Sequence, residues 1–341
     1  MKRPRILLIY TGGTIGMVKQ AHTGTLKAFN FESMADQIPE LKLLDCDTET
    51  VSFETPIDSS DMSVGHWIKM AEIIEERYDH YNGFVVLHGS DTMSYSAAAL
   101  SFMLENLSKP VIFTGSQLPI GDLRTDAKEN LITSIQLAAL QEKGQPLITE
   151  VGLYFEYKLY RGNRTTKINA AHFQAFNSLN YPPLAESGVS LEVARHLLLR
   201  PKKGKGFCCH KQMDPAVGVL KLFPGISETF VKSVIESPGL KALVLETYGA
   251  GNAPTAPWFL GLLGAAIKNG LIIVNVTQCS GGSVLMGHYE SSLALENIQL
   301  INGKDISTEA ALAKLMYLLG SGVSTASFKT IFETALRGEM Q

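Results

Sequence analysis

The sequence contains few cysteines, little net charge and no long apolar run. Four cysteines in 341 residues, two of them adjacent, are too few for a disulfide framework and predict reduced thiols in a cytoplasmic protein. No apolar stretch is long enough to span a bilayer, and the stretch that ends at Tyr10 is too short for a secretory signal. The formal net charge of −3 gives no electrostatic reason to bind nucleic acid or an anionic membrane surface.

Two local clusters have the residue types of a binding site but lack the spacing. Cys208-Cys209-His210 has neither Cys-x-x-Cys spacing nor a second ligand pair, so we expect no bound metal. The basic segment 200–205 contains Pro and Gly, which indicates a solvated linker and not a nucleic-acid surface.

Apolar runs alternate with helical patterns in both halves of the chain, which predicts an α/β protein with two α/β domains and mainly parallel sheets. Arg, Lys, Gly and Pro break this pattern near residues 195–215. We therefore predict an N-terminal domain at 1–195, a linker at 196–215 and a smaller domain at 216–341. The predicted strands are 6–10, 50–54, 83–87, 111–113, 151–155, 217–222, 242–247 and 271–276. The predicted helices are 31–37, 63–79, 93–107, 122–141, 227–236, 256–268, 308–319 and 324–336.

Two hydroxyl-rich turns directly follow buried strands. The turn Thr11–Gly16 follows the first apolar run, and the turn His88–Met93 follows the run 83–87. Ligands of open α/β sheets bind at the carboxyl ends of the strands, so we expect both turns at the functional site. Thr14 and Ser90 supply hydroxyl groups there, which predicts nucleophilic chemistry by a hydroxyl.

Each turn also has a purely structural interpretation. The glycines of the first turn do not have the spacing of a dinucleotide-binding fingerprint, and Gly249–Pro254 fits only half of it. Asp91 precedes a strongly periodic helix, where Asp is a favoured N-cap. His88 is either a base or a buried, satisfied imidazole, and we favour the second because no Ser-His-Asp arrangement can be traced.

Two further segments combine charged and hydroxyl groups. Asp58, Ser59 and Ser60 either anchor a charged, amino-acid-like ligand or form a helix-entry turn. Lys167 closes the segment 161–167 and is either a base beside a hydroxyl or an ordinary surface lysine. Neither segment decides the function by itself.

Five segments in one order carry a family resemblance. They are Thr11–Gly16, Asp58–Met62, His88–Met93, Thr114–Pro119 and Arg161–Lys167. Together they make the chain resemble the bacterial-type L-asparaginases, specifically the cytoplasmic type I branch, from about residue 5 to residue 338. The resemblance implies an asparaginase/glutaminase-like fold and hydrolysis of L-asparagine to L-aspartate and ammonia, without a cofactor or metal.

The resemblance also implies roles for individual residues. The nucleophile falls on Thr14, which forms an acyl-enzyme with the substrate. The second hydroxyl is that of Ser90, with Asp91 and Lys167 as its partners. The residues implied to bind the substrate are Asp58, Ser59, Ser60, Ser90 and Asp91.

Three positions depart from the family pattern. Ser90 stands where the family usually has Thr, and the hydroxyl is retained. Thr25 aligns with a Tyr that a mobile loop commonly supplies to the site. Glu246 aligns with an Arg that some type I members use to bind a second asparagine, and a carboxylate cannot grip another carboxylate in this way. An allosteric pocket would then be lined by Thr166, Glu246, Asn252 and Cys279.

The resemblance implies a homodimer or a homotetramer (a dimer of dimers), with Asn252 contributed by the neighbouring subunit. Other functions stay open: a glutaminase or other amidohydrolase of the family, an amidotransferase subunit, or a noncatalytic amino-acid-binding protein. An amidotransferase subunit normally carries an extra amino-terminal domain, whereas the first signature here begins at residue 11. The presence of Thr14, Asp91 and Lys167 favours an enzyme over a binding protein.

Overall fold

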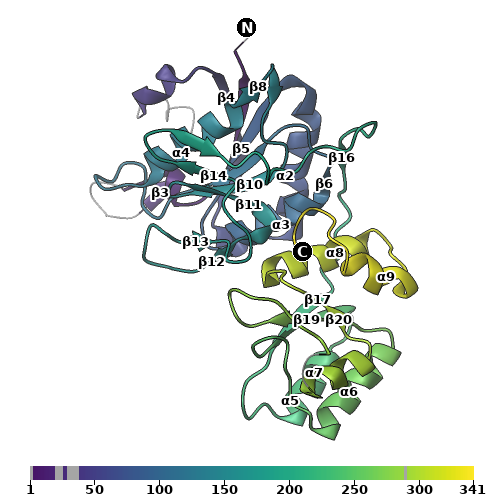
Figure 1. Ribbon diagram of the computed structural model, residues 1–341. Coiled ribbons are helices and arrows are strands. Elements are labelled where there is room, and N and C mark those ends of the chain that lie inside the picture. The colour runs from purple at the N-terminus through teal and green to yellow at the C-terminus, as the bar shows by residue number, and fades with distance from the viewer. Residues whose placement is uncertain (1–2, 20–25, 29–37, 288–289) are drawn as a thin grey trace. The chain divides into compact units, whose positions relative to one another are not determined.

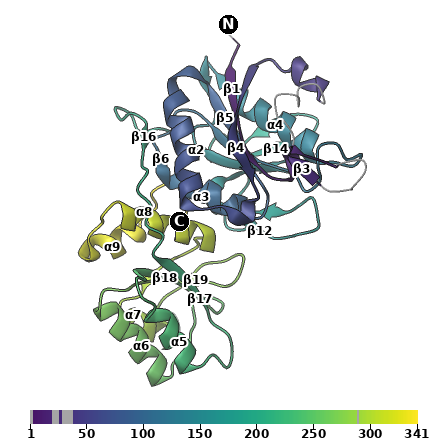
Figure 2. The same ribbon diagram turned by 180° about the vertical axis from the view of Figure 1, so that it is seen from behind.

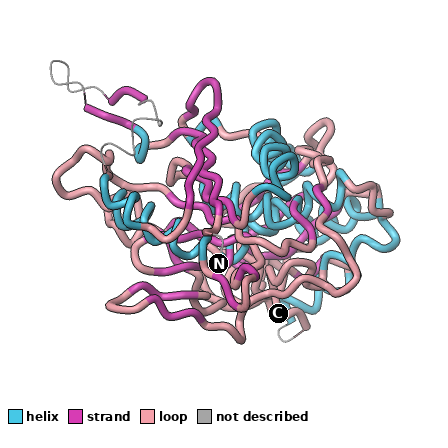
Figure 3. The backbone as a smooth tube through the Cα atoms, turned by 90° about the horizontal axis from the view of Figure 1, so that it is seen from above, coloured by secondary structure: helices cyan, strands magenta, loops and turns pink. Residues whose placement is uncertain are grey.

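The computed structural model describes residues 3–19, 26–28, 38–287 and 290–341. The predicted helix 31–37 lies outside these residues. The chain divides into two compact units, Met1–Lys211 and Gln212–Gln341, which we describe separately. Both helices and strands occur in the described residues (Figure 3). The division falls within residues 196–215, and residues 196–211 belong to the first unit.

The first unit is built on a large sheet. Its strands are β1 (Arg5–Gly12), β4 (Asp47–Ile57), β5 (Gly83–Leu87), β7 (Val111–Thr114), β10 (Val151–Phe155), β11 (Lys158–Arg161), β14 (Ala185–Ser187) and β15 (Leu191–Val193). Among the described residues, these eight strands lie in the order β15-β14-β11-β10-β7-β5-β1-β4. The strands from β4 to β10 in this order pair in parallel. The apolar runs of β5, β7 and β10 are wholly buried, as expected for a sheet covered on both faces.

The edge beyond β10 is antiparallel, and the sequence pattern does not predict it. β10 and β11 form a hairpin in which Phe155 pairs with Lys158, leaving a two-residue turn. Both turn residues, Glu156 and Tyr157, have positive φ values of 41° and 68°. Such turns usually contain Asn or Gly, so this hairpin carries no recognisable sequence signal.

Helices cover both faces of this sheet. α4 (Ala127–Ala139) packs on one face, where Leu131 and Ile135 join the core with Leu8 and Val85. α2 (Val64–Arg77) and α3 (Met93–Met103) lie side by side (Figure 2). α3 packs against β7 and β10.

Two predicted helix boundaries in the first unit are wrong. α3 ends at Met103 because Leu104–Glu105 forms a short strand, β6, that pairs with β16 (Cys208–Cys209). Every residue of α3 except Tyr95 is buried, so the helix is enclosed rather than amphipathic. α4 begins at Ala127 and not at Asp122, because turns occupy the residues before it.

Shorter elements complete the first unit. The two-stranded pairs are β2 (Met17–Lys19) with β3 (Leu26–Ala28), β8 (Gln141–Glu142) with β9 (Gln145–Pro146), and β12 (Thr166–Lys167) with β13 (Phe176–Asn177). Single-turn 3-10 helices occupy Thr14–Gly16, Pro39–Leu43, Ser59–Asp61, Tyr78–His80 and Gly162–Arg164.

The second unit is a smaller α/β layer structure. Its elements are β17 (Val217–Lys221), α5 (Glu228–Ile235), β18 (Ala242–Thr247), α6 (Pro257–Lys268), β19 (Ile272–Thr277), α7 (Glu290–Asn297), β20 (Ile301–Asn302), α8 (Thr308–Gly320) and α9 (Thr325–Phe332). In the described residues of this unit, four strands pair in parallel in the order β17-β18-β19-β20. α5 and α6 pack on one face of the sheet and α8 on the other (Figure 1). The two α/β sheets agree with the predicted fold class.

A buried ion pair holds the last residues of the chain against α8. Lys314 and Glu339 contact each other, and both side chains are 0% exposed. Lys314 Nζ also donates to the carbonyl oxygens of Phe332 at 2.6 Å and Thr334 at 2.7 Å. Glu339 accepts the backbone N–H groups of Leu336 and Arg337, so both charges have several partners.

Glycines allow the carboxyl ends of the parallel strands to meet without intervening side chains. A Cβ atom on Gly13 would lie 2.5 Å from the Cα of Gly89, and one on Gly89 would lie 2.5 Å from Ser59 Oγ. On Gly12 it would overlap the carbonyl oxygen of Ile57. The turns after β1, β4 and β5 are therefore in direct contact.

This contact predicts an unequal response to two glycine substitutions. Gly13→Ala is expected to lower the free energy of unfolding by about 3 kcal/mol, because it combines positive-φ strain with overpacking. Gly144→Ala is the matched control, since Gly144 has a similar φ of 78° but no atom within 4 Å of the place that an added methyl carbon would take. It is expected to cost about 1 kcal/mol from the backbone alone. Urea unfolding measures the free energy of unfolding of both variants. Equal losses would show that the close contact at Gly13 adds nothing to the cost of the substitution.

Candidate active site

A hydrogen bond from a side chain to the backbone joins the turn Thr11–Gly16 to the end of β5, directly before the turn His88–Met93. Thr11 is 1% exposed, and its Oγ1 donates to the carbonyl oxygen of Leu87 at 3.0 Å. Beyond it, Gly13 contacts Gly89, so Thr14 and Ser90 each directly follow one of two touching glycines. Thr14 is half-buried at the start of its 3-10 helix.

A lysine from a distant strand reaches the second turn. Lys167 Nζ lies 2.8 Å from Ser90 Oγ and 2.7 Å from Asp91 Oδ1, although 77 residues separate it from Ser90. The Lys167 side chain is 17% exposed, whereas that of Asp91 is 67% exposed. The structure therefore brings together three of the four residues expected to act catalytically, and it places Lys167 in a site and not on an ordinary surface.

The segment that carries Lys167 is anchored by a buried ion pair at its beginning. Arg161 Nε lies 2.6 Å from Glu150 Oε2, and both side chains are 4% exposed. Glu150 Oε1 also accepts the backbone N–H of Leu199 at 2.7 Å. At the other end, Lys167 pairs with Phe176 in the β12–β13 ladder. Lys167 is thus supported from both sides along the chain.

Asp91 does not cap α3. The N-cap residue is Thr92, and it makes no side-chain capping hydrogen bond. Thr92 Oγ1 instead donates to the carbonyl oxygen of Ser59 at 2.6 Å, which joins the second turn to the third segment. The capping interpretation of Asp91 is therefore wrong, and its carboxylate faces Lys167.

The third segment forms a turn stabilised by its own carboxylate. Asp58 Oδ1 accepts from the Ser60 hydroxyl at 2.6 Å and from the Ser60 backbone N–H at 2.9 Å. These hydrogen bonds lower the pKa of Asp58, the one from the Ser60 side chain having the larger effect. Ser59 is 3% exposed, whereas Asp58 and Ser60 are exposed. The turn therefore presents polar groups beside Gly89 while closing itself with local bonds.

His88 has the environment of a structural residue. It is 0% exposed, its Nδ1 lies 2.7 Å from the carbonyl oxygen of Gly89, and its ring lies edge-on to Phe113. Burial lowers the pKa of His88 to about 4, so the imidazole is neutral near pH 7. Its Nε2 has no hydrogen-bond partner among the described residues. The favoured interpretation of a buried, satisfied imidazole is therefore correct for its burial and for Nδ1, but not for Nε2.

Gln117 is a site residue that the sequence analysis does not single out. Ser90 Oγ donates to Gln117 Oε1 at 3.1 Å. Gln117 stands within the segment 114–119, which follows β7, the next strand along the sheet. An amide is neither an acid, a base nor a nucleophile, so a search for reactive residue types passes over it. The feature of the sequence that could indicate Gln117 is its position just after a parallel strand, where ligands of α/β sheets bind.

The other predicted residues have the following local environments. Thr25 lies outside the described residues. In the second unit, Glu246 accepts from Thr308 Oγ1 at 2.6 Å and lies 3.4 Å from Lys221 Nζ. Its backbone oxygen accepts from Gln278, the neighbour of the exposed Cys279. Asn252 forms a backbone bridge with Tyr248, and Thr166 precedes Lys167 in β12.

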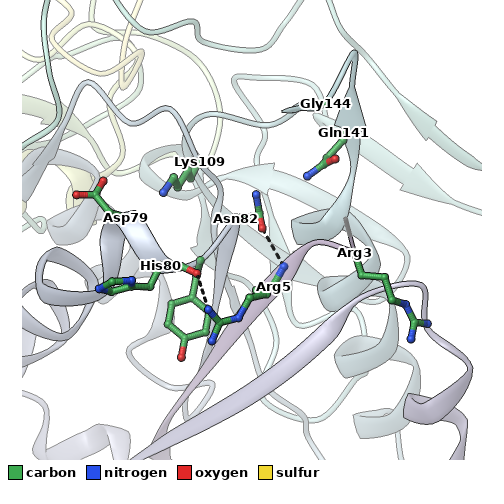
Figure 4. A pocket seen from close by; sticks show the side chains of 9 residues that line it. Arg3, Arg5, Asp79, His80, Asn82, Lys109, Gln141 and Gly144 are labelled. Atoms are coloured by element: carbon green, nitrogen blue, oxygen red, sulfur yellow. Dashed lines mark hydrogen bonds between the residues drawn. The ribbon is translucent and has the colours of Figure 1, made fainter. Parts of the chain in front are cut away.

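A polar pocket at the opposite edge of the first sheet is not the candidate site. Its lining includes Arg3, Arg5 and Lys109 at the amino ends of the parallel strands (Figure 4). Arg5 lies 2.5 Å from Glu49, and Arg3 lies 3.7 Å from Asp45. Arg3 and Arg5 are thus paired with carboxylates, and Lys109 Nζ contacts the carbonyl oxygen of Tyr78.

Two kinds of feature are absent from the described residues. No group of three or more His, Cys, Asp or Glu side chains there has the arrangement of a metal site. In the same part of the chain, no helix combines the length and apolar character needed to cross a membrane.

Comparison with known proteins identifies the family. Residues 5–199 match the family description "Asparaginase, N-terminal", and residues 216–332 match "Glutaminase/Asparaginase C-terminal domain". The chain belongs to the asparaginase family. These two matches cover both units of the structure.

Individual proteins are similar to this chain over 98–100% of its length. L-asparaginase 1 of Escherichia coli (strain K12) is 43% identical, with 100% of this chain and 99% of that protein covered. The 60 kDa lysophospholipase of Mus musculus is also 43% identical, but the chain spans only 62% of its length. The crystal structure of L-asparaginase I from Vibrio cholerae has a TM-score of 0.91 and 41% identity, with 100% of both chains covered.

The environment of His88 predicts a loss of stability in mild acid. The unfolded-state imidazole binds a proton near pH 6.5, whereas the folded one does so only near pH 4, so unfolding takes up a proton between these values. The stabilisation is complete above about pH 6.5 and is lost as the pH falls; its loss between pH 7 and pH 5.5 is about 1 kcal/mol. His88→Asn, in which an amide N–H replaces Nδ1–H, is expected to lose about 1 kcal/mol less over the same interval. Urea unfolding at both pH values measures this, and parallel losses in the two proteins would contradict it.

Proposed function

We propose that the protein is an L-asparaginase that hydrolyses L-asparagine to L-aspartate and ammonia, with Thr14 as the nucleophile. The observation that carries the proposal is the Lys167–Ser90–Asp91 cluster beside the Gly13–Gly89 contact. The cluster provides a second hydroxyl group and a paired amine close to the carboxyl ends of β1 and β5. Thr14 lies in the turn that follows β1. Family membership and full-length similarity to proteins named L-asparaginase support the choice of substrate.

In the proposed reaction, two displacements occur at the side-chain amide carbon of the substrate. Thr14 Oγ forms a bond to this carbon, the C–N bond breaks, and the hydroxyl proton leaves with the nitrogen as ammonia. Water then attacks the resulting aspartyl ester, its proton returns to Thr14 Oγ, and aspartate is released. Backbone N–H groups of the glycine turns are suited to stabilise the oxyanion formed in each step.

The cluster around Ser90 is proposed to move protons during these steps. Lys167 donates to the oxygens of both Ser90 and Asp91 in the resting arrangement. A lysine held between a hydroxyl and a carboxylate can exchange a proton with the hydroxyl while the carboxylate balances its charge. The partly buried position of Lys167 favours direct transfer over exchange with bulk water.

The substrate's charged ends are proposed to bind at the turns around this cluster. Asp58, Asp91 and Ser60 present polar groups that suit an α-amino and an α-carboxylate group. Ser59 and Ser90 complete the proposed binding set. Because Asp58 stays ionised through its bonds from Ser60, it is suited to hold an ammonium group.

Assembly and location are proposed from the family resemblance. We propose a cytoplasmic homodimer or homotetramer, in which Asn252 reaches the site of a neighbouring subunit and Thr25 contributes from the loop after the first turn. We also propose that Thr166, Glu246, Asn252 and Cys279 line any regulatory pocket. Within the second unit, Glu246 is held by Thr308 and Lys221, which supports a structural role for this carboxylate.

The assignment of the nucleophile predicts a sharp difference between two substitutions. Thr14→Ala removes the attacking oxygen and is expected to lower kcat by at least about 1000-fold. Thr14→Ser retains the oxygen and serves as the matched control, with a much smaller loss expected. Ammonia release measures kcat, and binding of aspartate to Thr14→Ala verifies that the site is intact. Substantial turnover by Thr14→Ala would exclude Thr14 as the nucleophile.

Substrate preference and cooperativity form a further prediction. Ammonia release from L-asparagine is expected to exceed that from L-glutamine by at least about 10-fold in kcat/KM, because one extra methylene must fit the site. The asparagine saturation curve is expected to be hyperbolic, since Glu246 cannot bind a second substrate carboxylate as an Arg would. A preference for glutamine would favour the glutaminase alternative. A sigmoidal asparagine curve would show that regulation persists by another route.

A further inference from the structure

We propose that Gln117 is a positioning residue that holds the Ser90 side-chain oxygen in one rotamer beside Lys167 in the resting site. The inference rests on the proposed catalytic roles of Ser90 and Lys167 and extends them to a residue without reactive chemistry of its own. It concerns the direction of each hydrogen bond through Ser90.

Two backbone carbonyl groups fix the orientation of the Gln117 amide. Gln117 Nε2 lies 3.0 Å from the carbonyl oxygen of His172 and 3.4 Å from that of Ala170. Carbonyl oxygens only accept hydrogen bonds, so the NH₂ end of the amide must face them. The Oε1 end then faces Ser90, at 3.1 Å.

The orientation of the amide determines the direction of the next two bonds. An amide oxygen only accepts, so Ser90 must donate its proton to Gln117. The lone pairs of Ser90 Oγ are left to accept from Lys167 Nζ at 2.8 Å. The resting chain of donors therefore runs from Lys167 through Ser90 to Gln117, and Ser90 is held between two partners.

The backbone of Gln117 is itself clamped. The N–H of Gln117 lies 2.9 Å from Asp126 Oδ2, and the N–H of Leu118 lies 3.1 Å from Asp126 Oδ1. Asn130 on α4 donates to the carbonyl oxygen of Gly115 at 3.0 Å. Asp126 and Asn130 thus fix the loop after β7 to the beginning of α4, and the Gln117 side chain starts from a rigid position.

Gln117 also connects the two sides of the site. Its amide reaches residues 170 and 172, which lie between β12 and β13, shortly after Lys167. The same side chain therefore contacts Ser90 and the loop that follows Lys167. Movement of either partner would be transmitted to the other through one amide.

An external partner is needed because serine has a loosely restricted side chain. A Ser side chain has a single heavy atom beyond Cβ and can occupy three staggered χ1 wells, whereas the branched Thr side chain is more restricted. For Ser90, the bond to Gln117 supplies the restriction that branching would supply. Removing it is expected to reduce the fraction of sites with the hydroxyl in place.

A double-mutant cycle tests this inference. Gln117→Met keeps the length of the side chain and removes both hydrogen-bonding ends, and it is expected to lower kcat/KM for asparagine by about 10-fold. In a Ser90→Thr background the same change is expected to cost less than about threefold, because the branched side chain restricts its own rotamer. The loss in the Ser90 background is expected mainly in kcat, since the amide is not proposed to touch the substrate.

Controls separate positioning from loss of structure. Gln136→Met on the exposed face of α4 is the matched control and is expected to leave kcat/KM unchanged. Thermal unfolding of each variant shows whether the fold is retained. Equal losses from Gln117→Met in both backgrounds, or no loss in either, would overturn the proposal.

The proposed function fails on a different result. If Ser90→Ala or Thr14→Ala turned over asparagine at the wild-type rate, the catalytic assignments themselves would be wrong. If both were inactive while the cycle showed no coupling between Gln117 and Ser90, the assignments would stand and the positioning role alone would be rejected.

Discussion

The candidate site depends on the contact between the backbones of Gly13 and Gly89. Parallel strands bring their carboxyl ends to one edge of a sheet, but side chains at the following turns would normally hold those turns apart. Here each turn has a glycine at the point of contact, and Ser59 fills the space beside Gly89. The hydrogen bond from Thr11 to Leu87 and that from Thr92 to Ser59 then hold the turns in place. These bonds can form only because the backbones already lie so close.

The ion pair between Lys167 and Asp91 orients the two side chains but adds little to the stability of the fold. Asp91 is two-thirds exposed, and a pair in such contact with water stabilises a protein by only about 0–1 kcal/mol. The position of Lys167 is therefore set elsewhere, by the ladder between β12 and β13 and by the buried Arg161–Glu150 pair at the start of its segment. Asp91 remains exposed to solvent and Lys167 is partly buried, while the Arg161–Glu150 pair that anchors the segment is buried.

Sequence reasoning predicted the parts of this arrangement that are local. The apolar runs of β5, β7 and β10 predict buried parallel strands, and the glycines beside Thr14 predict a tight turn at a strand end. The hairpin at Glu156 and Tyr157 was missed because two residues adopt positive φ without the usual Asn or Gly. The contact between Lys167 and Ser90 joins residues 77 positions apart, and only the family resemblance indicated it. Gln117 acts by its orientation, which two distant carbonyl groups determine and no local pattern encodes.

Because of the Lys314–Glu339 pair, residues after Phe332 contribute to the stability of the second unit. A terminal segment normally tolerates nonsense and frameshift lesions better than a core does. Here a reading frame interrupted after Phe332 would still encode Lys314 but not the anion that neutralises it inside the second unit. A buried cation that loses its partner typically costs about 3–5 kcal/mol, which is a large fraction of the stability of a domain. Residues 333–341 therefore include an anion that the interior of the second unit requires.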